Sequence, residues 1–168
     1  MKLVLALFMM LTAPLAVAGE WDKAQLALET PVDITVNRSP NCQCCHKWIE
    51  HLQAHGFNVI DEVSHNLETV PARANVPNEL RSCHTAVVDG YLIEGHVPAD
   101  DIKQLLLQKP DITGLTVPQM PVGTPGMEMG PRKDNFTVIS FDKAGQYRIF
   151  NRYEVGADGD YHKIATPE

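Results

Sequence analysis

The chain has 168 residues, and its 14 Lys and Arg against 21 Asp and Glu give a formal net charge of −7. This acidic balance argues against binding to nucleic acid, because the phosphate backbone attracts basic proteins. The length is enough for one domain with its own hydrophobic core.

The first 18 residues have the pattern of a secretory signal peptide. Lys2 precedes an apolar run, and Ala16-Val17-Ala18 matches the small-residue cleavage site. The run is short for a bilayer span, and no second apolar segment is long enough to cross a membrane. We therefore expect an exported protein that is cleaved after Ala18 and does not bind a membrane afterwards.

The next part of the chain, residues 19–110, alternates predicted strands and helices in the order β-α-β-α-β-β-α. Apolar residues at helical spacing after Asn41 indicate a helix, and Asp89-Gly90 suits the type I′ turn of a hairpin. The expected elements are a strand over 32–36, a helix from Ser39-Pro40-Asn41 to His55-Gly56, a strand over 57–63, a short helix over 67–74, a hairpin over 85–93 and a helix from Pro98 to before Pro110. This order predicts an α/β protein with a thioredoxin-like domain.

Residues 111–168 have a different character, and we expect them to form a C-terminal extension packed on the same domain. Residues 115–131 are rich in Pro and Gly with almost no periodicity. A second hairpin is predicted over 136–141 and 147–153, turning near 143–145. Loops as long as 115–131 are usually functional or disordered.

Three of the chain's four cysteines lie within four positions, at Cys42, Cys44 and Cys45. In an exported protein, structural disulfides are the ordinary interpretation of cysteines. However, bridges within this motif would close very small loops and constrain the unfolded chain little. The spacing therefore argues against a purely structural role.

Thiol–disulfide exchange is a second interpretation, because Cys42 and Cys45 form a C-x-x-C at a predicted helix start, where the helix dipole favours thiolates. Thioredoxin-like exchangers usually carry a proline just before the third strand, facing the two cysteines. Here the fourth cysteine, Cys83, stands there instead. This position therefore argues against efficient exchange, and all four thiols are expected to meet at one place.

Metal binding is the third interpretation. Soft sulfur ligands select Cu(I), zinc or iron–sulfur clusters. A zinc site of four cysteines normally uses two separated C-x-x-C pairs, and none of the usual iron–sulfur spacings occurs here. Three thiols packed so tightly are better suited to bridging several ions than to holding one tetrahedral ion.

The methionines favour copper among these metals. Beyond the predicted leader, the methionines are Met120, Met127 and Met129, all in the Pro/Gly-rich loop. Methionine that only fills a core would occur at scattered, periodic positions. Thioethers presented toward a thiolate cluster indicate copper, because zinc has little use for them.

Two histidines are candidates for the same site, since imidazole also suits copper. His96 lies at a strand-to-helix turn, in Gly95-His96-Val97-Pro98. His84 follows Cys83 directly, so strand alternation would turn its side chain away from that thiol unless the backbone is irregular there. The other histidines are interpreted as ordinary surface or partly buried residues: His46, His51, His55, His65 and His162.

Together these motifs resemble the CopG-type periplasmic copper-resistance proteins. The resemblance is carried by Cys42-x-Cys44-Cys45-x-x-Trp48, Ser82-Cys83-His84-Thr85, Gly95-His96-Val97-Pro98 and the stretch from Pro118 to Met129. It implies a thioredoxin-like domain whose C-terminal extension reaches the metal site. It also implies a cysteine-bridged multi-copper cluster that interconverts Cu(I) and Cu(II) in the periplasm, alongside copper efflux.

The sequence thus predicts a copper-binding protein of copper resistance. The expected metal ligands are Cys42, Cys44, Cys45, Cys83, Met120, Met127, Met129, His84 and His96, with no catalytic residue apart from them. The expected partners are copper ions and either copper-efflux components or an electron-transfer protein, and the expected state is a monomer. If the protein catalyses the interconversion of Cu(I) and Cu(II), it is an enzyme of the copper oxidoreductase class. The alternatives are a passive copper chaperone or buffer, and a thiol–disulfide oxidoreductase.

Overall fold

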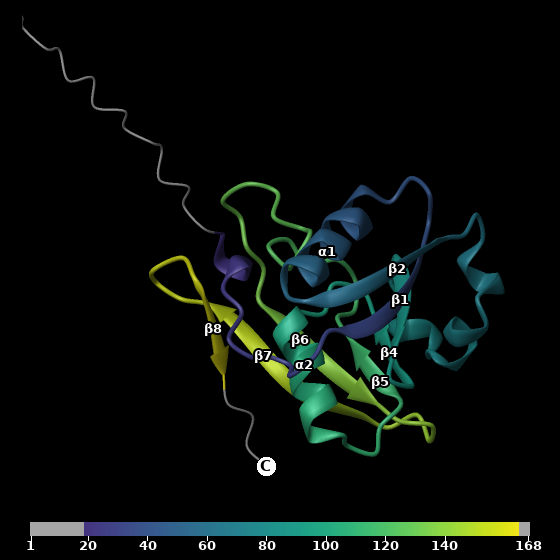
Figure 1. Cartoon of the computed structure of the whole chain (residues 1–168). Helices are drawn as coiled ribbons and strands as arrows, with labels where there is room; N and C mark the ends of the chain where they lie inside the picture. Colours follow the sequence, from purple (N-terminus) through teal and green to yellow (C-terminus); the bar gives the residue numbers. More distant parts are fainter. Residues whose placement is uncertain (1–18, 165–168) are drawn as a thin grey trace, which may run out of the picture.

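The computed structural model describes residues 19–164, and the predicted cleavage after Ala18 concerns residues outside this range (Figure 1). Over the described residues the chain forms one eight-stranded sheet in the order β2-β1-β3-β4-β5-β6-β7-β8. The strands are β1 (Val32–Arg38), β2 (Phe57–Val63), β3 (His84–Val88), β4 (Tyr91–Glu94), β5 (Gly114–Thr116), β6 (Phe136–Phe141), β7 (Tyr147–Val155) and β8 (Tyr161–Ile164).

Helices α1 (Gln43–Ala54) and α2 (Ala99–Gln108) accompany the sheet. Short 3₁₀ helices are η1 (Glu20–Asp22), η2 (Leu67–Thr69), η3 (Pro71–Asn75) and η4 (Asn78–Leu80). Between residues 19 and 164, no helix has the length and apolar character needed to cross a membrane. The predicted α/β class is confirmed.

Strands β1 to β4 form the part of the sheet that carries the cysteines. Strand β1 pairs in parallel with β2 and antiparallel with β3, and β3 forms an antiparallel hairpin with β4. Helix α1 makes the crossover between the parallel strands β1 and β2. This arrangement is compatible with the predicted thioredoxin-like domain.

Both α helices pack on the same face of the sheet. Trp48 and Leu52 of α1 and Ile102 of α2 are fully buried in one cluster with Ile34 and Ile93 of the strands. On the opposite face, a smaller cluster joins the 3₁₀ region to the sheet through Val76, Leu80, Leu92 and Phe141. The periodic apolar residues of the helices therefore build the main core, and the 3₁₀ region closes the other face.

Three local predictions were wrong. The helix expected over 67–74 is two short 3₁₀ helices, because Pro71 lacks the N–H that would continue the first turn. Helix α1 starts at Gln43, later than the expected start at 39–41. Strands β5 and β8 were not predicted, and β5 falls partly in the stretch interpreted as loop.

The second half of the chain continues the same sheet. Strand β5 pairs in parallel with β4, with Leu115 opposite Ile93, and β6 then runs antiparallel to β5. The segment between β5 and β6 returns toward helix α1 (Figure 1). An atom added at the Cβ position of Gly126 in this segment would lie only 2.7 Å from the Cys44 carbonyl oxygen and 2.8 Å from the Trp48 amide nitrogen. The loop therefore packs directly on the first turns of α1.

Candidate metal centre

The C-x-C-C motif occupies the N-terminus of helix α1. Cys42 is the N-cap residue, and its sulfur accepts a hydrogen bond of 3.3 Å from the Cys45 amide. Cys42 and Cys45 are joined by a disulfide, with their Cα atoms 5.3 Å apart. Cys44 and Cys83 are free thiols. Of the four cysteines expected as thiolate ligands, two are thus oxidised in this structure.

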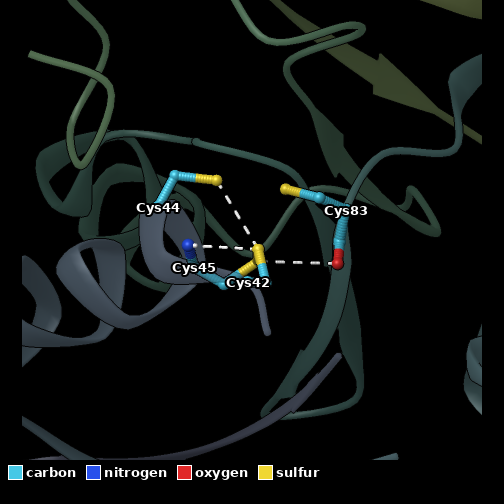
Figure 2. Close-up of side chains that lie close together, drawn as sticks. All are labelled: Cys42, Cys44, Cys45 and Cys83. Carbon is cyan, nitrogen blue, oxygen red and sulfur yellow. Dashed lines mark hydrogen bonds between the residues drawn. A yellow bond between two sulfur atoms is a disulfide. The ribbon is translucent and has the colours of Figure 1, made fainter. Parts of the chain in front are cut away.

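All four cysteine sulfurs lie close together. Each Sγ atom lies within 4.8 Å of the other three, and the Cys44 and Cys42 sulfurs are 3.5 Å apart. Figure 2 shows the Cys44 and Cys83 sulfurs directed toward one another across the gap between α1 and the segment before β3. The Cys83 carbonyl oxygen lies 3.5 Å from the Cys45 sulfur. The fold therefore gathers thiols that are about forty residues apart in the sequence.

Two imidazole rings extend this group on the Cys83 side. The Cys83 sulfur lies 3.3 Å from Nδ1 of His84 and 3.4 Å from Nε2 of His96. Strand alternation would turn His84 away from the thiol only if the backbone were regular there, and it is irregular at Cys83. Cys83 lies at a bend before β3, which begins at His84, so the alternation of a regular strand does not apply to this pair.

Hydrogen bonds to backbone carbonyls fix the tautomers of both rings. His84 Nε2–H donates to the Gly95 carbonyl at 2.9 Å, and His96 Nδ1–H donates to the Pro125 carbonyl at 2.8 Å. Burial of both rings lowers the pKa of His84 well below its ordinary value and also lowers the pKa of His96. Both rings are therefore neutral at neutral pH. The nitrogens that face Cys83 carry free lone pairs, the form in which histidine binds a metal.

The Cys83 thiol keeps its proton in the absence of a metal. Burial, reinforced by the neighbouring Cys44, raises the pKa of Cys83 to about 12. A soft cation binds the thiolate, so it must displace this proton. The donors in this centre are thus two neutral imidazoles and two free thiols, and they lie beside one disulfide.

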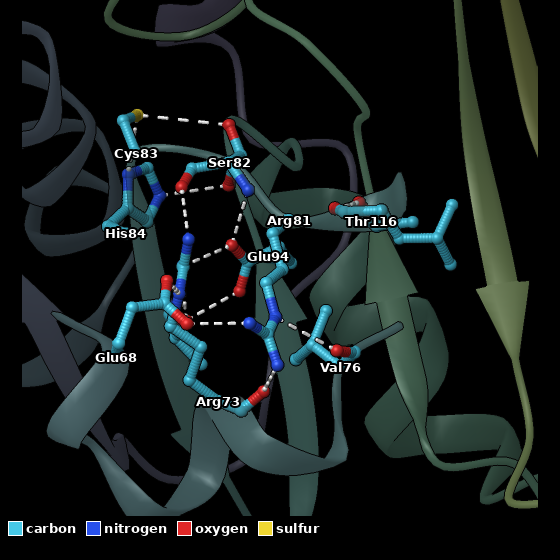
Figure 3. Close-up of polar contacts among 12 residues, drawn as sticks. Glu68, Arg73, Val76, Arg81, Ser82, Cys83, His84, Glu94 and Thr116 are labelled. Carbon is cyan, nitrogen blue, oxygen red and sulfur yellow. Dashed lines mark hydrogen bonds and ion pairs between the residues drawn. The ribbon is translucent and has the colours of Figure 1, made fainter. Parts of the chain in front are cut away.

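A buried polar network that was not predicted from the sequence holds the backbone around Cys83 (Figure 3). Glu94 is fully buried and accepts hydrogen bonds from the Ser82 amide at 2.5 Å, the Thr85 hydroxyl at 2.6 Å and Arg73 at 2.8 Å. Arg73 also donates to the Ser82 carbonyl at 3.1 Å. The network therefore fixes the residues on both sides of Cys83 and His84.

Little in the sequence pointed to this network. Glu94 ends an apolar strand, where a carboxylate is usually exposed, and Arg73 lies in a region predicted as a short helix. Burial raises the pKa of Glu94, while the hydrogen bonds from Thr85, Ser82 and Arg73 favour its charged form. Pairing with Arg73 makes such burial tolerable.

The three methionines have different environments. Met127 is buried, with 6% of its surface exposed, whereas Met120 and Met129 are exposed by 50% and 61%. Met127 follows Gly126, whose left-handed backbone (φ +84°) lets the loop approach α1 closely. The structure thus brings the cysteines and the two histidines together, and it leaves two of the three thioethers at the surface.

This fold and site define a mixed α/β protein with a convergent thiol and imidazole group able to hold a soft metal ion. A family model described as "Protein of unknown function, DUF411" matches residues 80–127. No curated protein matches the chain.

Two solved structures are similar over nearly their whole length. "Copper resistance protein copG- Form 2" is 46% identical, with 74% of this chain and 99% of that chain covered and a TM-score of 0.70. "Copper resistance protein copG- Form 1" is 47% identical, with 73% and 98% covered and a TM-score of 0.69. The chain belongs to the CopG family of copper resistance proteins.

Proposed function

We propose that this chain is an exported, periplasmic copper-binding protein that holds more than one copper ion and interconverts Cu(I) and Cu(II). The observation that carries the proposal is a pair of overlapping donor groups that share one residue. Cys42, Cys44, Cys45 and Cys83 form the first group once the Cys42–Cys45 disulfide is reduced, and Cys83, His84 and His96 form the second. A thiolate shared between two groups is suited to bridging two ions.

The two groups differ in chemistry, and this difference supports the redox role. Thiolate sulfur is a soft donor that favours Cu(I), whereas imidazole suits copper in general. A copper ion between Cys83 and the two imidazoles would have ligands acceptable to both oxidation states. The neutral rings of His84 and His96 provide these ligands without releasing a proton.

The loop contributes to this centre in two ways in our proposal. The Pro125 carbonyl orients His96, as the hydrogen bond of 2.8 Å shows. Met127, and with it Met120 and Met129, would supply thioethers that favour the reduced ion. We accordingly propose a thioredoxin-like domain over 19–110 and an extension over 111–168 that completes the site, in a monomer that serves copper efflux or an electron-transfer partner.

Metal analysis of the purified protein combined with a copper-oxidation-state spectrum tests the proposal. Samples are prepared with and without added reductant, and copper is expected in both, with Cu(I) dominating after reduction and Cu(II) detectable without it. Copper in one unchanging oxidation state would favour a passive chaperone or buffer. Zinc in place of copper would reject the proposal.

A thiol–disulfide oxidoreductase is the second candidate, and the disulfide between Cys42 and Cys45 is the observation in its favour. The position before β3 that usually holds a proline in such enzymes is occupied here by Cys83. Metal-free protein should therefore reduce insulin far more slowly than a thioredoxin does. Rapid insulin reduction would favour thiol–disulfide oxidoreductase activity over the proposed copper function.

A further inference from the structure

We propose that Cys42 and Cys45 are a two-electron couple that reduces Cu(II) held at the neighbouring thiols and imidazoles. This inference rests on the proposed function, because it names the internal electron source of the same site. Its basis is the division of the four cysteines into one disulfide and two free thiols within a single group.

The division leaves a complete set of donors when the couple is oxidised. With Cys42 and Cys45 joined, the remaining donors are the Cys44 and Cys83 thiols and the imidazoles of His84 and His96, and both imidazoles lie within 3.4 Å of the Cys83 sulfur. Copper therefore does not depend on the disulfide-forming pair to stay bound. The couple can change its oxidation state while the cation remains in place.

The electron path between the couple and the donors is short. The sulfur of Cys44 lies 3.5 Å from the sulfur of Cys42. Cys44 would thus be both a copper ligand and a direct neighbour of the couple. Cys83 adds a second contact, since its carbonyl oxygen lies 3.5 Å from the sulfur of Cys45.

The step balances without any other reactant. Two Cu(II) ions each accept one electron, the thiols of Cys42 and Cys45 lose two protons and form their S–S bond, and two Cu(I) ions result. The Cu(I) ions produced are soft cations, and the Cys44 and Cys83 sulfurs retained in the centre are the soft ligands that suit them. The product of the reaction is therefore the form that the remaining ligands hold best.

The two sulfurs of the couple differ in access, which indicates how it would be reduced again. Cys45 is fully buried, whereas Cys42 is partly exposed. Cys42 also lines a surface hollow of about 570 Å³ together with His46 and Lys47. A dithiol reductant would therefore attack the Cys42 sulfur, release the Cys45 thiolate and then close its own disulfide.

A single-turnover experiment tests the proposal on the full exported chain. Metal-free, fully reduced protein is mixed with copper(II) sulfate under nitrogen. More copper is added than the two Cu(II) ions that formation of each Cys42–Cys45 disulfide consumes. Electron paramagnetic resonance follows the loss of Cu(II), a Cu(I)-specific chelator counts Cu(I) after denaturation, and peptide mass spectrometry locates the disulfide. We expect two Cu(I) ions for each Cys42–Cys45 disulfide formed, with Cys44 and Cys83 still reduced.

The Cys42→Ser variant is the matched test, because serine is a good N-cap residue and keeps an acceptor for the Cys45 amide. It should retain copper at the donors that remain, Cys44, Cys83, His84 and His96, and should form Cu(I) about tenfold more slowly, because the couple is gone. Circular dichroism checks that the variant folds. If the variant does not fold, the disulfide located by mass spectrometry in the wild-type protein tests the couple on its own.

Two results would reject the proposed redox role of Cys42 and Cys45 without contradicting the proposed copper site. In the first, Cu(II) stays bound and paramagnetic with all four thiols reduced. In the second, Cu(I) forms but the disulfide joins Cys44 to Cys83 or links two chains. Protein that binds no copper at all would instead reject the proposed function, and the couple with it.

Discussion

Two segments approach the N-terminus of helix α1, and they are held in very different ways. The segment Ser82–His84 is fixed by the buried Arg73–Glu94 network and by the His84–Gly95 hydrogen bond. The loop between β5 and β6 is fixed where Gly126 contacts α1 and by hydrogen bonds from His96 to the Pro125 carbonyl and from the Ser82 hydroxyl to the Gln119 carbonyl, while the side chains of Met120 and Met129 are exposed.

In the proposed copper site, this difference would separate two tasks. On the Ser82–His84 side the His84 ring is fully buried and the Cys83 thiol is partly buried. Both are oriented before any metal arrives, so little rearrangement is needed to bind one. The exposed thioethers of the loop are in contact with solvent, where they can meet an incoming or departing ion. We therefore expect changes in the fixed segment to weaken copper binding strongly, and changes in the loop to alter the spectrum or ease of oxidation of the bound copper.

The largest effect is expected from Cys83→Ser, because Cys83 belongs to both donor groups. Copper capacity per chain should fall by roughly half or more, and the copper that remains should bind at least about tenfold more weakly. Cys44→Ser is the matched control, since Cys44 belongs only to the four-sulfur group. Equilibrium dialysis with metal analysis measures both, and equal losses in the two variants would contradict the bridging role of Cys83.

Glu94→Gln tests the support behind the fixed segment. The change leaves the Arg73 charge without its buried partner, so the free energy of unfolding should fall by about 3 kcal/mol and copper affinity by roughly tenfold. Glu68→Gln is the control, because Glu68 contacts the same Arg73 but its side chain is 58% exposed, and such a pair contributes about 1 kcal/mol or less. Denaturant unfolding and copper competition give the two values. A Glu94→Gln protein as stable as the control would show that the network does not support the segment.

Acidification should lower the free energy of unfolding of the metal-free protein through His84 in the fixed segment. Burial lowers the pKa of His84 below its ordinary value of 6.5, so the folded state favours the neutral ring. That stabilisation is present above pH 6.5 and is lost as the pH falls below it, by at most about 1.4 kcal/mol per pH unit. Urea unfolding between pH 7 and pH 5 should show a shallower pH dependence in His84→Gln than in the wild type. The exposed His65 provides the control. If the free energy of unfolding changed equally with pH in His84→Gln and His65→Gln, the lowered pKa of His84 would not be the cause of the pH dependence.

The smallest effect on folding is expected from the double change Met127→Leu/Met129→Leu. The substitutions keep bulk and apolarity while removing both sulfurs, and such volume-conserving changes usually cost less than about 1.5 kcal/mol. Thiolates still bind Cu(I), so copper should remain bound while its spectrum, its stoichiometry or its ease of oxidation changes. Each single variant separates the buried Met127 from the exposed Met129. Identical copper content, spectrum and redox behaviour in the double variant and the parent would remove the loop from the site.

Much of this arrangement could be predicted because it depends on local patterns. Apolar residues at helical spacing located α1 and α2, and Asp89-Gly90 located the β3–β4 hairpin. Placing Cys83 just before the third strand of a thioredoxin-like order was enough to expect it opposite the C-x-C-C motif. The side-by-side position of the sulfurs follows from that topology.

Other features depend on tertiary contacts that a single sequence does not reveal. The direction of His84 depends on the bend at Cys83, and the buried position of Glu94 depends on Arg73 reaching it from a separate 3₁₀ helix. Strand β5 has only three residues and needs its neighbours β4 and β6 to form. Sequence also does not give the oxidation state of Cys42 and Cys45, because the same C-x-x-C can form a disulfide or hold a metal.

The central claim is that the two donor groups that share Cys83 together hold more than one copper ion. A Cu(I) titration of the fully reduced chain tests this claim most directly. Native mass spectrometry counts the bound ions while a thiol-specific reagent reports which cysteines are protected. We predict saturation above one ion per chain, with all four cysteines protected together. Saturation at a single ion with all four cysteines protected would contradict the account and would identify a mononuclear site.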